Sequence, residues 1–194
     1  MIKFENVSKV YPNGTRGLED INLEIEQGEF VGIIGTSGAG KSTLIRTINA
    51  LNNITAGTLI VNDTDVAKLK GKGLREFRKH VGMIFQSYNL VPRVSVIRNV
   101  LSSRVPNMSF LKVCFGLFSK EDKLKALDAL NRVGILDKAY IRADQLSGGQ
   151  QQRVSLARAL AQDADILLAD EPVAALDPVT AREVMDDFKR INQE

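Results

Sequence analysis

The stretch EFVGIIGTSGAGKSTLIRTINAL, residues 29–51, decides the fold of this chain. It opens with a continuous apolar run at residues 29–34, which is typical of a central strand in a parallel sheet. Residues 35–42 then match the pattern G-x-x-x-x-G-K-[ST] in full, and we expect a helix at residues 42–51. A strand before the loop and a helix after it are the context that a phosphate-binding loop requires. The alternative, a glycine-rich turn with a chance lysine, leaves that context unexplained.

The chemistry of the loop follows from its residue types. Gly35, Gly38 and Gly40 allow positive φ and a close approach of backbone N–H groups to a β-phosphate. Lys41 is expected to neutralise charge on the β- and γ-phosphates, and the Ser42 hydroxyl to bind Mg²⁺. The predicted cofactor-binding set is the whole loop, namely Gly35, Thr36, Ser37, Gly38, Ala39, Gly40, Lys41, Ser42 and Thr43.

An acidic pair, Asp170 and Glu171, follows the buried strand expected at residues 165–169. A carboxylate at the carboxyl end of a parallel strand faces the ligand crevice. Asp170 is suited to a water-mediated contact with Mg²⁺, and Glu171 to polarising an attacking water. The alternative is an ordinary acidic turn before Pro172, and the phosphate loop favours the functional interpretation.

A second candidate anion site is the pentapeptide LSGGQ, which includes Ser147, Gly148, Gly149 and Gln150. It opens an amphipathic helix expected at residues 150–162. Two glycines at a helix start leave backbone N–H groups free to bind an anion, and the helix dipole favours negative charge there. Two phosphate-binding helix starts in one chain suggest a nucleotide held between two surfaces.

The predicted architecture is α/β. It has a P-loop NTPase (RecA-like) core, an antiparallel β-layer formed by the first strands, and a helical insertion. We expect a single domain over residues 1–194, with the core and β-layer at 1–88 and 158–194 and the helical subdomain at 89–157. The remaining expected strands are residues 2–11, 18–25, 58–61 and 81–85, and the remaining helices are residues 74–79, 94–104, 120–133 and 179–192.

Composition is that of a soluble globular protein, with 44% hydrophobic and 25% charged residues. No run approaches the length of a membrane span, and the first residues do not read as a secretory signal. Cys114 is the only cysteine, which excludes an internal disulfide and fits a reducing compartment. The net charge of +3 is too small to argue for a partner.

Taken together, these motifs resemble the ATP-binding subunits of ABC transporters, and they occur in the family's order along the whole chain. GTSGAGKST looks like the Walker A loop, LSGGQ is the family signature, ILLADEP looks like the Walker B strand and Ala175-Leu176-Asp177 the D-loop. Gln86 sits where the family places a glutamine with catalytic, metal-binding and coupling roles. Tyr11 sits where it places an aromatic that stacks on adenine.

The resemblance implies ATP and Mg²⁺ as cofactors and a head-to-tail homodimer, in which Ser147, Gly148, Gly149, Gln150 and Asp177 of one copy approach the ATP of the other. It also implies transmembrane permease subunits, an extracytoplasmic substrate-binding protein as an indirect partner, and no nucleic acid. The expected location is the cytoplasmic face of the cell membrane, with peripheral attachment.

A narrower resemblance lies in FSKEDKLKALDALNRVGILDKAYIRADQLSGGQQQRV, residues 118–154, which is similar to ATP-binding subunits of phosphonate importers. The family pattern continues after residue 194 with a further strand and a histidine that contacts the γ-phosphate. From this we expect ATP binding with slow hydrolysis or none. Other classes remain open: another ABC importer or exporter, or a soluble ABC ATPase. A P-loop kinase or GTPase has no place for LSGGQ.

Several residues carry two interpretations. Tyr11 is expected to stack on adenine rather than to stabilise the β-layer alone, and Gln86 to act at the nucleotide rather than as a solvated amide. His80 is expected at the surface, and Cys114 in packing. The apolar stretch FLKVCFGLF, residues 110–118, either docks a membrane subunit or forms the core of the insertion's own helices.

Overall fold

The computed structural model describes residues 1–193 and divides into two compact units. The first comprises residues 1–78 together with the last residues from Lys189, and the second comprises residues 79–188. The predicted boundaries of an α/β core and a helical subdomain at residues 89–157 stay a prediction.

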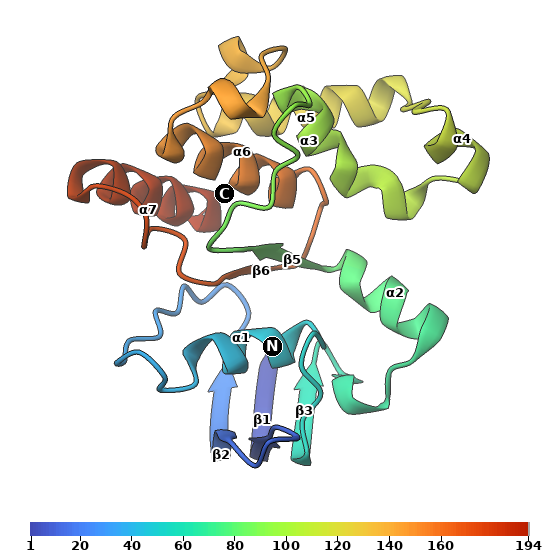
Figure 1. Ribbon diagram of the computed structural model, residues 1–194. Coiled ribbons are helices and arrows are strands. Elements are labelled where there is room, and N and C mark those ends of the chain that lie inside the picture. The colour runs from blue at the N-terminus through green and yellow to red at the C-terminus, as the bar shows by residue number, and fades with distance from the viewer. Residues whose placement is uncertain (194) are drawn as a thin grey trace. The chain divides into compact units, whose positions relative to one another are not determined.

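The first unit is built on an antiparallel sheet whose strands β1, β2 and β3 are drawn in Figure 1. The strand order is β2-β1-β3-β4. The register pairs Ile2 with Val61 and Phe4 with Leu59, so that apolar residues share one face. This sheet is the predicted antiparallel β-layer. Its strands are β1 (Ile2–Val10), β2 (Arg16–Ile25), β3 (Ala56–Val61) and β4 (Thr64–Asp65).

Three helical segments complete the first unit. Helix α1 (Lys41–Ile48) buries Leu44 and Ile48, while the sheet buries Phe4 and Leu59. Removing such side chains from water is the main stabilising contribution to a small core. A single 3₁₀ turn, η1 (Val66–Lys68), precedes α2 (Gly71–Lys79), which buries no residue of its own.

The strand predicted at residues 29–34 is wrong: this segment belongs to no strand among the described residues. Its side chains are largely exposed, with Phe30 44%, Val31 47% and Ile34 98% accessible. A strand exists only where a neighbour completes its hydrogen-bond ladder, and apolar character alone cannot supply that neighbour.

The second unit joins a two-stranded parallel sheet to a group of helices. Strand β5 (Val81–Ile84) pairs with β6 (Ile166–Ala169), and Ile84 lies opposite Ala169. The helical segments are α3 (Val96–Leu101), η2 (Ser102–Asn107), α4 (Phe110–Cys114), α5 (Lys120–Arg132), η3 (Leu136–Lys138), η4 (Ala143–Gln145), α6 (Gly148–Leu160) and α7 (Pro178–Gln193).

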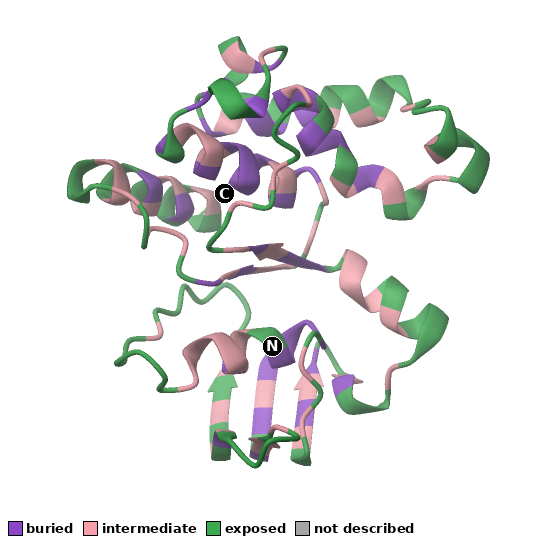
Figure 2. Cartoon of the chain, in the orientation of Figure 1, coloured by how far each residue is buried: buried purple, intermediate pink, exposed green. Residues whose placement is uncertain are grey.

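The core of the second unit lies where α3, α5 and α6 pack on one another, and Figure 2 shows buried residues gathered there. Val96, Val100, Leu130, Val154 and Leu156 are fully buried. Helix α5 begins with a capping box, in which the Ser119 hydroxyl accepts from the Asp122 N–H and the Asp122 carboxylate accepts from the Ser119 N–H.

An ion-pair group centred on the buried Arg104 connects the ends of these helices. The guanidinium of Arg104 donates to Asp122 at 3.0 Å and to Asp163 at 3.1 Å, and also to the Ala161 carbonyl. Burial raises the pKa of the Asp122 carboxyl, but the hydrogen bonds from Ser119 and Arg104 outweigh it and leave that pKa below its ordinary value. The group therefore joins η2, α5 and the end of α6.

The helix predicted at residues 94–104 is shorter than expected. It ends at Leu101 and continues as the 3₁₀ segment η2, which contains Pro106. Proline has no N–H to donate, and the hydroxyls of Ser102 and Ser103 bond to backbone carbonyls three residues back. These features favour the tighter turn.

Helix α4 and the turn after it bear on the predictions for Cys114 and for the apolar stretch at residues 110–118. Cys114 is exposed, so its predicted packing role is wrong. Phe110 is 80%, Leu111 69% and Phe115 73% accessible, and α4 buries no residue. These three side chains therefore do not form the core of the helical insertion.

Candidate functional site

The phosphate loop in the first unit has the backbone that its glycines predict. Gly38 has φ 82° and Gly40 φ 90°, both in the left-handed region. A β-carbon on Gly38 would meet nothing within 4 Å, so glycine is required there by the backbone and not by crowding. The space that a β-carbon on Gly38 would occupy is therefore open.

Lys41 folds over its own loop. Its ammonium donates to the carbonyls of Gly35 and Thr36, each at 2.9 Å. A lysine ammonium has three donors, so one remains for an incoming anion after these two bonds. The positive charge is therefore already held above the loop, which fits a phosphate group.

The loop is fastened to the β-layer at close contacts that only glycine permits. A β-carbon on Gly40 would lie 2.4 Å from the Gly17 carbonyl oxygen. A β-carbon on Gly17 would lie 2.7 Å from a ring carbon of Tyr11 and 3.1 Å from the Thr43 methyl group. Gly17 is a site residue that sequence reasoning missed, because its partners are distant in the chain.

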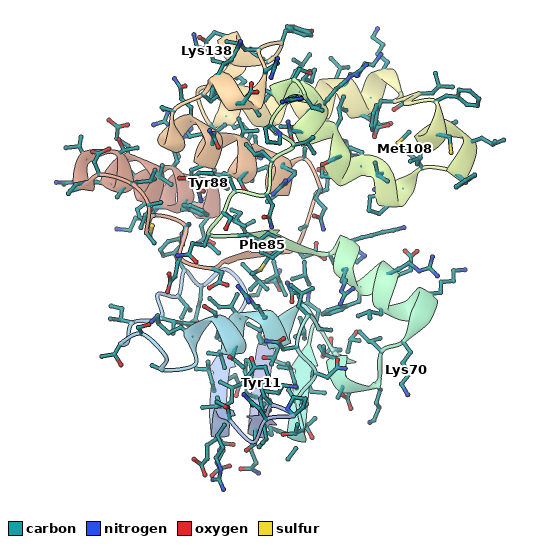
Figure 3. The ribbon with its side chains drawn as sticks, viewed as in Figure 1. Tyr11, Lys70, Phe85, Tyr88, Met108 and Lys138 are labelled. Atoms are coloured by element: carbon teal, nitrogen blue, oxygen red, sulfur yellow. The ribbon has the colours of Figure 1, made fainter. Side chains whose placement is uncertain are left out.

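Tyr11 contacts the same helix start, and Figure 3 labels it. Its hydroxyl oxygen lies 3.0 Å from Thr43 Oγ1 and accepts from Asn52 Nδ2 at 3.2 Å. The ammonium of Lys9 lies 5.2 Å from the ring centroid. Tyr11 thus ties the β-layer to α1, and its stacking on adenine stays a prediction.

In the second unit the structure brings Gln86 and Glu171 together. Gln86 Nε2 donates to Glu171 Oε2 at 3.1 Å, although 85 residues separate them. The contact exists because β5 and β6 are parallel neighbours and both side chains follow their carboxyl ends. Glu171 has φ 50°, a left-handed conformation that costs a non-glycine residue about 1–2 kcal/mol.

Asp170 precedes it at the end of β6. Its side chain is buried, with 2% of the residue accessible, and its N–H donates to the Ile84 carbonyl at 3.0 Å. The predicted Walker B carboxylate is therefore fixed by the same strand pair. The left-handed backbone of Glu171 and the burial of Asp170 are consistent with the predicted roles of these residues, which stay predictions.

The LSGGQ segment forms a closed capping box. The Ser147 hydroxyl accepts from the Gln150 N–H at 3.3 Å, and Gln150 Oε1 accepts from the Ser147 N–H at 3.1 Å. Both side chains therefore support the helix start, and the N–H groups of Gly148 and Gly149 are the donors best suited to an anion.

Packing also restricts the two glycines, severely at Gly149 and less so at Gly148. A β-carbon on Gly149 would lie 2.4 Å from the Thr180 methyl group, and one on Gly148 would lie 3.2 Å from the Tyr88 hydroxyl oxygen. Thr180 belongs to α7, whose start is capped by Asp177: Asp177 Oδ1 accepts from the N–H groups of Val179 and Thr180, each at 3.1 Å. The signature and the D-loop thus meet through Gly149 and Thr180.

His80, the only histidine in the sequence, lies at the surface as predicted. Its Nδ1 and Asp165 Oδ2 are 2.9 Å apart. Among residues 1–193, no helix combines the length and the apolar character needed to cross a membrane.

The fold and the two sets of motifs define an ABC cassette. Residues 18–174 match the ABC transporter family, and the chain belongs to that family. Over all 194 residues it is 80% identical to the phosphonates import ATP-binding protein PhnC of Lactococcus lactis subsp. lactis (strain IL1403), and it spans 79% of that relative. It is 61% identical over 193 residues to the protein of the same name from Staphylococcus aureus (strain MRSA252), covering 100% of this chain and 75% of the relative.

Solved structures show the same fold. A dimeric bacterial ABC transporter cassette, MJ0796, is 37% identical, with a TM-score of 0.86 over 100% of this chain and 83% of its own. A second dimeric structure of that cassette, bound to ADP and Pi after hydrolysis, gives a TM-score of 0.85 at 36% identity and covers 99% of this chain and 83% of its own. The predicted fold class is confirmed, and the chain is a nucleotide-binding cassette.

Proposed function

We propose that this chain is the ATP-binding, energy-coupling subunit of an importer for phosphonates. The observation that supports phosphonates as the substrate is the 80% identity, over the full 194 residues, to a phosphonates import ATP-binding protein. No residue described above recognises a phosphonate chemically. The substrate assignment therefore depends on similarity. The ATPase assignment is also supported by the geometry of the phosphate loop in the first unit and, separately, by that of Gln86, Asp170 and Glu171 in the second.

Residues of the phosphate loop bind the triphosphate in this proposal. Lys41 already lies over the loop through two carbonyl contacts, and its third donor is directed to the β- and γ-phosphates. The hydroxyls of Ser42 and Thr43 and the loop N–H groups complete the set. Ser42, Asp170 and Gln86 offer the oxygen ligands that Mg²⁺ prefers, and a bound Mg²⁺ would neutralise phosphate charge.

Glu171 is the proposed general base. Its carboxylate polarises the attacking water, and Gln86 orients that carboxylate through the 3.1 Å hydrogen bond. Glu171 has a left-handed backbone with φ 50°, and such strained residues cluster at functional sites, which supports this role.

The working unit is a head-to-tail dimer in which the LSGGQ segment of one copy meets the ATP of the other. The dimeric MJ0796 cassette supports this assembly by its similarity to the chain. ATP binding closes the dimer and hydrolysis reopens it. Membrane-spanning permease subunits, reached at the cytoplasmic face of the membrane, use that movement, and an extracytoplasmic binding protein delivers the phosphonate.

A chimaera tests the proposal. The 194 residues replace the matching 194 residues of the Lactococcus lactis relative. The chimaera is expressed in Lactococcus lactis cells from which the gene for that relative has been deleted. We expect uptake of a radiolabelled alkylphosphonate to be restored. Unlabelled alkylphosphonate should compete for this uptake, and an unrelated amino acid should not.

The matched control carries Lys41→Ala in the same chimaera and should give no uptake. ATP binding without any phosphonate uptake would keep the cassette assignment and refute the substrate. Equal uptake by the Lys41→Ala chimaera would refute the role of the phosphate loop.

A further inference from the structure

The loop that follows Gln86 has an unusual backbone. Tyr88 has φ 59° and Asn89 has φ 50°, so two consecutive non-glycine residues are left-handed. L-residues rarely adopt this region, an aromatic residue especially, and such conformations persist only where the surroundings hold them. The loop therefore needs a support outside its own sequence.

Arg158 on α6 supplies that support. Its guanidinium donates to the Asn89 carbonyl at 2.6 Å and to the Tyr88 carbonyl at 2.8 Å. A planar fork that bonds two successive carbonyls fixes both peptide groups at once, which a point charge cannot do. Arg158 is itself half-buried, and burial lowers the pKa of its guanidinium.

The Tyr88 side chain also lies beside the same helix. Its hydroxyl oxygen would lie 3.2 Å from a β-carbon on Gly148, so the phenol reaches the first turn of α6. Figure 3 labels Tyr88 on the loop after β5. Ten residues separate Gly148 from Arg158, which is about 15 Å along a helix axis. The loop is thus attached to α6 at two well-separated points.

We propose that Tyr88 and Arg158 are positioning residues that fasten the Gln86 loop to α6, so that Gln86 and Ser147 move together. The roles of Gln86 and Ser147 rest on the proposed function, but the attachment does not. A displacement of the loop is then transmitted to the LSGGQ segment without rearrangement of the helix itself.

Hydrogen exchange of the nucleotide-free chain tests the attachment. Arg158→Met keeps the length of the side chain and removes its donors. We expect peptides covering residues 86–92 and 146–153 to exchange together, each at least tenfold faster than in the unmodified chain. The control Arg98→Met, at an exposed position of α3, should change neither. Faster exchange in one of the two segments alone would overturn the proposal.

A second substitution distinguishes a positioning role of Arg158 from an effect on the overall stability of the fold. Glycine adopts the left-handed region freely, so Asn89→Gly added to Arg158→Met should return part of the protection in both segments. Ser87→Gly, at a neighbouring residue without positive φ, should not. Equal rescue by both glycines would mean that Arg158 acts only through overall stability. If Arg158→Met does not fold, Arg158→Lys, which keeps the charge without the fork, replaces it with the same expectations.

The nucleotide experiment then uses Tyr88→Phe, which removes only the hydroxyl. Its affinity for ATP should stay within twofold, while the yield of ATP-dependent dimer falls at least threefold. Equal losses of affinity and dimer would contradict a positioning role. If the unmodified chain binds no ATP, the proposed function fails, and the exchange result still decides the attachment.

Discussion

At the scale of single residues, the candidate functional side chains are held in place by hydrogen bonds within the chain. Lys41 is bonded to two loop carbonyls, and Glu171 is bonded to Gln86, before any nucleotide arrives. Such preorganisation lowers the cost of ordering these groups when a ligand binds. A ligand therefore meets charges that are already in place.

Lys41→Ala tests the phosphate loop. The substitution removes the ammonium and leaves the backbone cradle, so we expect affinity for ATP to fall at least tenfold, or about 1.4 kcal/mol. Titration with a fluorescent ATP analogue measures it. Lys72→Ala, at an exposed position of α2 in the same unit, is the matched control. Equal affinity of the Lys41→Ala variant and the unmodified chain would contradict the assignment.

Asp177 gives a prediction for pH. The hydrogen bond from Thr180 and the N–H groups at the start of α7 hold the pKa of the Asp177 carboxyl below its ordinary value of 3.8. A lowered folded-state pKa means that the charged cap stabilises the fold above pH 3.8 and loses that effect as the pH falls through the lower value.

Denaturant unfolding across this acidic range measures the Asp177 contribution. The difference in unfolding free energy between the unmodified chain and Asp177→Asn should decrease as the pH is lowered. A difference that is constant from neutral pH downward would show that the carboxylate charge does not contribute to the cap.

The sequence predicted a set of site residues, but it predicted few of the contacts between them. It paired Gln86 and Glu171 with one function, and the structure joins them by a hydrogen bond. It did not predict that Gly17 packs on Tyr11, or that Gly149 packs on Thr180. Motifs record which residue types a ligand needs, whereas these contacts depend on where distant segments meet.

At the scale of elements, hydrophobic periodicity predicted most helices and strands, and the exceptions have physical causes. The strands β1, β2, β5 and β6 and the helices α5 and α7 lie within a few residues of their expected ranges. The strand expected at residues 29–34 failed because its apolar run specifies burial but names no hydrogen-bond partner. Helix α3 ended early because Ser102, Ser103 and Pro106 favour a tighter turn.

The contact between α6 and α7 gives a prediction about elements. Gly149→Ala would place a methyl group 2.4 Å from the Thr180 methyl group, so one helix must shift. We expect a loss of about 1–3 kcal/mol in unfolding free energy, as for overpacking in a core. Denaturant unfolding measures it.

Thr180→Ser supplies the matched control, because serine lacks the clashing methyl group and keeps the hydroxyl beside Asp177. The double variant Gly149→Ala with Thr180→Ser should recover most of the lost stability. If the loss of unfolding free energy in the double variant equals the sum of the losses in the two single variants, the methyl contact is not the cause.

At the scale of the whole molecule, the decisive property is assembly. The LSGGQ segment places its anion-binding N–H groups at the start of α6, where Ser147 and Gln150 are occupied by their capping box. In the proposed dimer, those N–H groups bind the ATP held by the second copy. ATP-dependent association therefore tests the signature and the catalytic residue at once.

Glu171→Gln should accumulate an ATP-bound dimer, because loss of the carboxylate removes the general base while the phosphate loop still binds ATP. Light scattering coupled to size exclusion, with ATP and Mg²⁺ present, should show the mass of two chains, and with ADP the mass of one. Adding Ser147→Arg puts a bulky side chain in the space that the partner's phosphate would occupy and removes the hydroxyl of the capping box, so the double variant should bind ATP and stay monomeric. A Glu171→Gln variant that binds ATP yet remains monomeric would remove the dimer from the proposed mechanism.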